Sequence, residues 1–83
     1  LRVYPNPVPP DTYSVNLLYL VQASTTLSVQ LYNTSGKLVR DVNFSLSDIN
    51  VPAELSLGNL AAGVYILKWQ EKSNSGQFKI VKL

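Results

Sequence analysis

The chain has neither cysteine nor histidine among its 83 residues. Without cysteine no disulfide framework supports the fold, and without either residue type the usual general base, thiol nucleophile and soft metal ligands are missing. The 5 carboxylates are scattered along the sequence and form no dense calcium-type cluster. No glycine-rich loop of the phosphate-binding kind occurs. We therefore expect no enzymatic activity, no metal site and no cofactor.

Charge and long apolar runs are scarce as well. Charged residues make up 14% of the chain, against roughly 25% in ordinary domains. The net charge of +2 is too small to indicate nucleic-acid binding. No apolar run approaches the ~18 residues of a membrane helix, and no signal peptide opens the chain. Because methionine is absent even at position 1, we expect a single domain, residues 1–83, detached from a larger protein.

Residues that favour β-strands dominate what remains, and no stretch has helical periodicity. About seven short strands at close spacing predict an all-β fold, an immunoglobulin-like antiparallel β-sandwich. The expected strands are Leu1–Tyr4, Tyr13–Gln22, Thr26–Tyr32, Lys37–Phe44, Ala53–Leu57, Gly63–Lys72 and Gln77–Leu83.

The stretch Leu60–Trp69 carries the strongest strand signal. Tyr65, Leu67 and Trp69 share one face because strand side chains alternate, and we expect that face to lie in the core. Gly63 precedes Tyr65 by two residues, where the chain turns in. This arrangement predicts a tyrosine corner, in which the Tyr65 hydroxyl binds backbone near Leu60.

Alternation also predicts which side chains of the other strands face inward. These are Tyr13, Val15, Leu17 and Tyr19 in the second strand, Leu27, Val29 and Leu31 in the third, Leu38, Val42 and Phe44 in the fourth, and Phe78 and Ile80 in the last. Leu18 and Leu20 make the second strand apolar on both faces, as in a central or covered strand. Arg40 shares the inward face of its strand, which indicates a bulge or a strand end nearby.

Turn chemistry separates these strands. Gly36 can close the hairpin after Asn33 in a left-handed conformation, and Ser73–Gly76 repeats the same turn pattern. Ser45–Pro52 is expected to be a loop. The prolines between Tyr4 and Asp11 cannot donate to a ladder, so this segment is expected to be a rigid cover at an edge of the sandwich; a proline-rich ligand for an adaptor domain is the alternative.

Three motifs now stand in a fixed order: Tyr4–Val8, Val29–Val39 and Leu60–Tyr65, followed by Gly76 and the terminal Lys79–Leu83. Together they resemble the type A C-terminal sorting domain of the bacterial type IX secretion system, over nearly the whole chain. Trp69 departs mildly from the family pattern, which usually has an aliphatic residue there. The positions that carry the resemblance are Tyr4, Pro5, Asn6, Pro7, Gly36, Leu60, Gly63 and Tyr65.

The resemblance implies a function. Such domains end cargo proteins of Bacteroidota-type bacteria and direct them, by way of the periplasm, through the outer-membrane translocon to the cell surface or medium. The implied partners are the translocon and its shuttle proteins, the upstream cargo domain, and a sortase-like cysteine peptidase that commonly removes the domain and can join the cargo to lipopolysaccharide.

The resemblance also implies a recognition segment, which comprises Lys79, Ile80, Val81, Lys82 and Leu83. We expect this segment to lie at an open sheet edge that a partner can extend by strand addition, with Val81 and Leu83 as exposed apolar contacts flanked by the two lysines. On this interpretation it is needed for export and contributes little to folding. The alternative is an immunoglobulin- or fibronectin-like spacer, adhesion or carbohydrate-binding module, with Trp69 as a candidate sugar platform.

Overall fold

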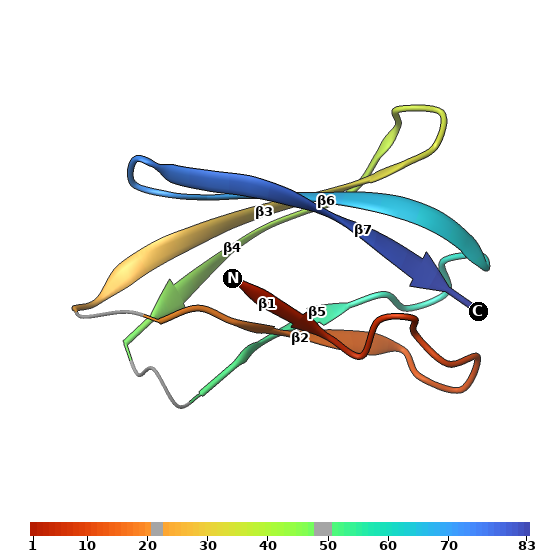
Figure 1. Cartoon of the computed structure of the whole chain (residues 1–83), viewed down its shortest axis with the longest axis horizontal. Helices are drawn as coiled ribbons and strands as arrows, with labels where there is room; N and C mark the ends of the chain where they lie inside the picture. Colours follow the sequence, from red (N-terminus) through yellow and green to blue (C-terminus); the bar gives the residue numbers. More distant parts are fainter. Residues whose placement is uncertain (21–22, 48–50) are drawn as a thin grey trace.

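The computed structural model describes residues 1–20, 23–47 and 51–83 of the chain, and these residues form β-strands and their connections (Figure 1). The strands are β1 (Arg2–Tyr4), β2 (Ser14–Leu18), β3 (Thr25–Asn33), β4 (Leu38–Leu46), β5 (Ala53–Ser56), β6 (Gly63–Glu71) and β7 (Asn74–Lys82).

The strands form two antiparallel sheets that lie as two layers (Figure 1). One sheet has the order β1-β2-β5, and the other has the order β4-β3-β6-β7. The architecture confirms the predicted all-β sandwich. It also confirms that the second strand is central, because β2 lies between β1 and β5.

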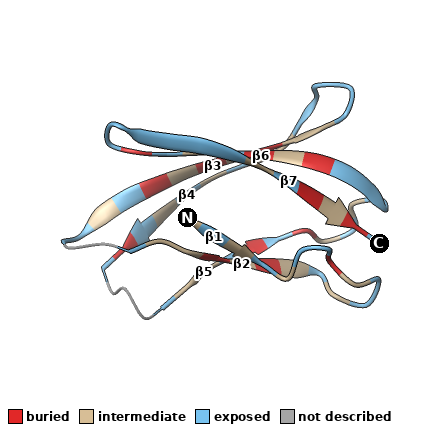
Figure 2. Ribbon diagram, viewed as in Figure 1, coloured by how far each residue is buried: buried red, intermediate tan, exposed pale blue. Residues whose placement is uncertain are grey.

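The core consists of side chains from both inner faces. Figure 2 marks the positions of buried residues as red bands on the ribbon. Its fully buried members are Val8, Val15, Leu17, Leu27, Val29, Leu31, Leu55, Leu57, Leu67 and Ile80. The alternation of β3 and β6 predicted their inward residues correctly. Val8 contributes to this set from outside the strands, between the prolines.

The ends of β2 and β4 differ from the prediction. β2 begins after Tyr13, which is 63% exposed rather than inward, and ends at Leu18. The last two residues of the predicted strand, 21 and 22, lie outside the described residues, as do residues 48–50 of the predicted loop. β4 continues to Leu46, whose buried side chain extends the inward row of the strand, so assigning Ser45 and Leu46 to the loop was wrong.

The β3–β4 hairpin confirms two predictions and corrects a third. Gly36 has φ 83°, the left-handed conformation expected of it. The register shifts beside Leu31, opposite Arg40, which is the predicted irregularity. It lets the Arg40 guanidinium reach the other sheet, where it donates to the Ser56 and Leu57 carbonyls at 3.0 Å each. Leu38 precedes the irregularity and is 42% exposed, so placing it in the core was wrong.

The β6–β7 hairpin turns at residues 72 and 73, and the predicted turn over Ser73–Gly76 is wrong. Gly76 lies within β7, directly opposite Trp69. A Cβ on Gly76 would meet the Trp69 Nε1 at 2.8 Å, so the glycine provides the space that the indole occupies. Trp69 is half-buried and packs against the core, with its ring centroid 5.3 Å from that of Tyr19.

The tyrosine corner is present. Tyr65 is buried, and its hydroxyl donates to the Ala61 carbonyl at 2.6 Å, one residue from the expected acceptor. Gly63 has φ 152°, a backbone conformation that side chains rarely adopt. The corner therefore fixes the connection between β5 and β6 to the start of a central strand of the larger sheet.

Replacing Tyr65 by Phe removes the corner hydrogen bond and leaves the ring in the core. We expect the free energy of unfolding to fall by about 0.5–1.5 kcal/mol, the net value of one such bond. Equilibrium denaturation measures the change, with Tyr13→Phe at an exposed position as the control. Equal midpoints for the two variants would contradict the corner.

Replacing Gly76 by Ala places a methyl group against the indole of Trp69. We expect a loss of about 1–3 kcal/mol, as for other overpacked contacts, and a change in Trp69 fluorescence. Ser75→Ala, at the neighbouring exposed position, is the control and should leave both quantities unchanged. A stable Gly76→Ala variant with unaltered fluorescence would show that the indole does not need this space.

Candidate recognition site on the terminal strand

The terminal segment Lys79–Leu83 is held by two distant parts of the sequence. On one side it pairs with the start of β6, where Gly63 lies opposite Lys82 and Tyr65 opposite Ile80. These β6 residues belong to the third sequence motif. The motif that forms the tyrosine corner therefore also provides the strand partner of the terminal segment.

On its other side, the terminal segment is covered by the first motif. The Val8 N–H donates to the Val81 carbonyl at 2.7 Å, and the Leu83 N–H donates to the Val8 carbonyl at 2.9 Å. The side chain of Asn6 completes the row, because its Nδ2 donates to the Lys79 carbonyl at 2.8 Å and its Oδ1 accepts from the Val81 N–H at 3.0 Å. We call these four hydrogen bonds the edge clamp.

The composition of the first motif explains this geometry. Val8 bonds β7 through its own N–H and C=O, but the next two bonds come from the side chain of Asn6 and not from its backbone. The Asn6 amide carries a donor and an acceptor on one group and so replaces a peptide unit of the ladder. Val8 then inserts its side chain into the core, where it has no exposed surface. The predicted cover at an edge of the sandwich is thus confirmed, and it lies on the terminal strand.

The clamp overturns the expectation of an open edge at Lys79–Leu83. The outward backbone groups of Val81 are both bonded, as are the Lys79 carbonyl and the Leu83 N–H. Because Val81 and Leu83 also hold the Val8 segment in place, we now expect their removal to destabilise the fold. The earlier expectation that the segment contributes little to folding is therefore replaced by its opposite.

The five predicted recognition residues divide between the two faces of β7. Ile80 is 1% exposed and Lys82 is 7% exposed, so both point inward. Lys79 is exposed, Val81 is half-buried and Leu83 is 54% exposed, and these three share the outer face. Leu83 is exposed as predicted, whereas Val81, which was also predicted to be exposed, is half-buried. The prediction that Lys82 lies on the outer face with Leu83 was wrong. Strand side chains alternate, so Lys82 points inward together with Phe78 and Ile80.

Val64 extends this outer surface onto β6, because it lies opposite Val81 and is 37% exposed. The outward positions of β6 and β7, all of which the structure describes, include two lysines, Lys68 and Lys79, and no carboxylate. We call the group Val64, Lys79, Val81 and Leu83 the terminal surface. It is apolar with a positive rim.

Comparison with known families identifies the domain. The family model of the secretion system C-terminal sorting domain matches residues 2–83. The chain belongs to this family. Searches of curated proteins and of solved structures found no match.

The domain is therefore a C-terminal sorting signal of the type IX secretion system, which implies a cargo that is secreted or displayed on the cell surface and an interaction with that machinery. A sorting-signal domain is not a catalytic family. No group of three or more potential metal ligands occurs among the residues described. Within the same residues, no helix has the length and apolar character needed to span a membrane.

The opposite end of the sorting domain contains a polar cluster that the sequence analysis missed. Glu71 is 7% exposed, and its carboxylate accepts hydrogen bonds from Thr25 Oγ1 at 2.7 Å, Tyr19 Oη at 3.0 Å and Asn74 Nδ2 at 3.2 Å. Glu71 continues the inward phase of Tyr65, Leu67 and Trp69, and this phase was the signal that could have revealed it.

The hydrogen bonds determine the ionisation of this cluster. The bond from Thr25, followed by that from Asn74, lowers the pKa of Glu71 below its ordinary value. Burial, followed by the hydrogen bond to Glu71, raises the pKa of Tyr19. The cluster therefore contains a carboxylate at neutral pH, held by donors from three different parts of the sandwich: the segment after β2, β3 and β7.

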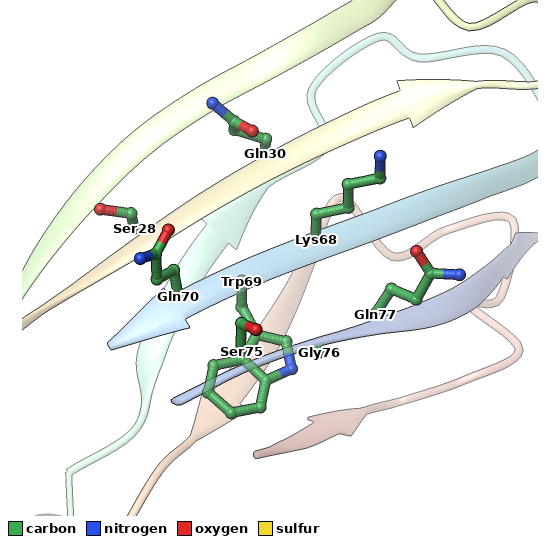
Figure 3. Close-up of a pocket in the computed structure, with 8 residues that line it drawn as sticks. All are labelled: Ser28, Gln30, Lys68, Trp69, Gln70, Ser75, Gly76 and Gln77. Carbon is green, nitrogen blue, oxygen red and sulfur yellow. The ribbon is translucent and has the colours of Figure 1, made fainter. Parts of the chain in front are cut away.

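A shallow hollow on the outer face of the larger sheet bears on the carbohydrate-binding alternative. Most of its lining side chains are polar, among them Gln30, Lys68, Gln70 and Gln77, and Trp69 also lines it (Figure 3). The Trp69 ring lies against β7 at Gly76, and its Nε1 is buried without a hydrogen-bond partner. Packed in this way against Tyr19 and Gly76, the indole does not offer a free sugar platform.

The lowered pKa of Glu71 predicts that acid destabilises the sorting domain. A depressed folded-state pKa contributes stability above the unfolded value, about 4.3 for Glu, and this contribution is lost as the pH falls through the folded value. We therefore expect the denaturation midpoint to fall over this range, and to fall less in Glu71→Gln. Midpoints measured from pH 7 to pH 3 test this; identical slopes for both proteins would contradict it.

Proposed function

We propose that the sorting domain ends a larger cargo protein and directs it from the periplasm through the outer-membrane translocon, with shuttle proteins as intermediate partners. The terminal surface is the part that this machinery recognises. The observation that supports this most is the division of β7: Ile80 and Lys82 anchor the strand inward, and Lys79, Val81 and Leu83 remain accessible.

The chemistry of the terminal surface suits a protein partner. Val64, Val81 and Leu83 offer apolar area whose burial favours association, and Lys79 adds a charge that steers an oppositely charged partner. We further propose that a sortase-like cysteine peptidase removes the domain after export and can transfer the cargo to lipopolysaccharide. The support for this last step is that the chain belongs to a family of secretion sorting domains.

Lys79→Glu and Leu83→Ser test the recognition step in a reporter fusion expressed in a host with a type IX system. We expect the amount of reporter in the medium to fall about tenfold or more, because a loss of 1.4 kcal/mol in binding is already tenfold in affinity. Reporter should accumulate in the periplasm instead. Both positions face solvent, so thermal unfolding of the purified variants should match that of the original domain.

Lys72→Glu is the matched control, since it makes the same charge change at the far end of the β6–β7 hairpin. Substitutions are preferable to a stop after Ile80, which would also remove the groups that hold Val8. If both folded variants are exported as well as Lys72→Glu, the terminal surface is not what the machinery recognises.

A further inference from the structure

The edge clamp restricts how a partner can approach the terminal segment. Strand addition needs unpaired backbone groups along an edge. Along Val81 and at the Leu83 N–H these groups are already bonded to Asn6 and Val8. Exposing them would require four hydrogen bonds to break and the fully buried Val8 to leave the core.

The side chains, by contrast, are accessible without any rearrangement. Ile80 and Lys82 point inward. The alternate side chains, those of Lys79, Val81 and Leu83, therefore project outward beside Val64. The orientation of this row depends on the strand being held from both sides, by Gly63–Tyr65 on one and by Asn6 and Val8 on the other. The terminal surface thus exists only in the folded domain.

We infer that the partner binds the terminal surface in place, on the intact sheet, with an apolar patch whose rim carries carboxylates, and that Asn6 is a positioning residue for this surface. The inference rests on the proposed function. Charge complementarity argues for the acidic rim, because the outward positions of β6 and β7, described throughout, contain lysines and no carboxylate.

A disulfide between positions 8 and 82 tests binding in place. These residues face each other in the clamp, and the natural chain has no cysteine that could compete for the pairing. A fusion with a cysteine-free reporter carrying Val8→Cys and Lys82→Cys would lock the clamp in the oxidising periplasm. We expect the locked protein to reach the medium at the level of the single-cysteine variants, with its disulfide intact. Retention of the oxidised protein in the periplasm, relieved by a reductant, would overturn the inference.

Asn6→Asp tests the positioning role. Asp keeps an acceptor for the Val81 N–H and loses the donor to the Lys79 carbonyl. We expect faster hydrogen exchange at the Val81 and Leu83 amides, unchanged exchange at Leu67, and reduced export that the disulfide lock between positions 8 and 82 restores. Export that stays normal despite the faster exchange, or that the lock fails to restore, would overturn the role of Asn6.

Lys79→Gln tests the chemistry of the partner. An acidic rim predicts that Lys79→Glu lowers export several-fold more than Lys79→Gln, because the first adds repulsion and the second only removes attraction. Equal losses would overturn the acidic rim.

The outcomes distinguish the two proposals. If neither Lys79→Glu nor Leu83→Ser affects export, the proposed recognition itself fails. If both variants reduce export and the disulfide-locked domain is retained in the periplasm, only binding in place fails.

Discussion

The hydrogen bonds from Asn6 and Val8 to the terminal strand are the interaction on which the rest of the structure depends. The chain leaves β1 in the smaller sheet, crosses to the larger sheet and covers the edge of β7 there. This crossing joins the first strand to the last in a chain that has no disulfide. Because Val8 is fully buried, the same segment that covers the edge also completes the core.

The two ends of the sandwich are held by different chemistry. At the terminal strand the contacts are hydrogen bonds between neutral groups and a buried valine, which do not titrate. At the other end, Tyr19, Thr25 and Asn74 converge on the carboxylate of Glu71, whose contribution depends on its ionisation. We therefore expect acid to weaken the contacts at the end that holds Glu71 and to leave the clamp chemically unchanged.

Local alternation was sufficient to predict the strands and most inward residues, because side-chain phase is a property of neighbouring residues. It succeeded for Leu27, Val29, Leu31 and Leu67. Turn chemistry failed where a contact across strands decides, as at Gly76, which lies in a strand and provides space for Trp69. Lys82 was predicted on the outer face, but it shares the phase of Phe78 and Ile80 and lies inward despite its charge. The role of Asn6 could not be predicted, since its partners lie more than 70 residues away.

The fold explains why sequence motifs that are individually weak become specific together. Asn6 and Val8 of the first motif and Gly63–Tyr65 of the third flank the same segment of β7 from opposite sides. The middle motif pairs with the third, because Asn33 lies opposite Tyr65. This arrangement depends on the order of the motifs and on the register of the strands that carry them. The motifs are therefore parts of one device that fixes the phase of the last strand, and that phase decides which of its side chains face outward.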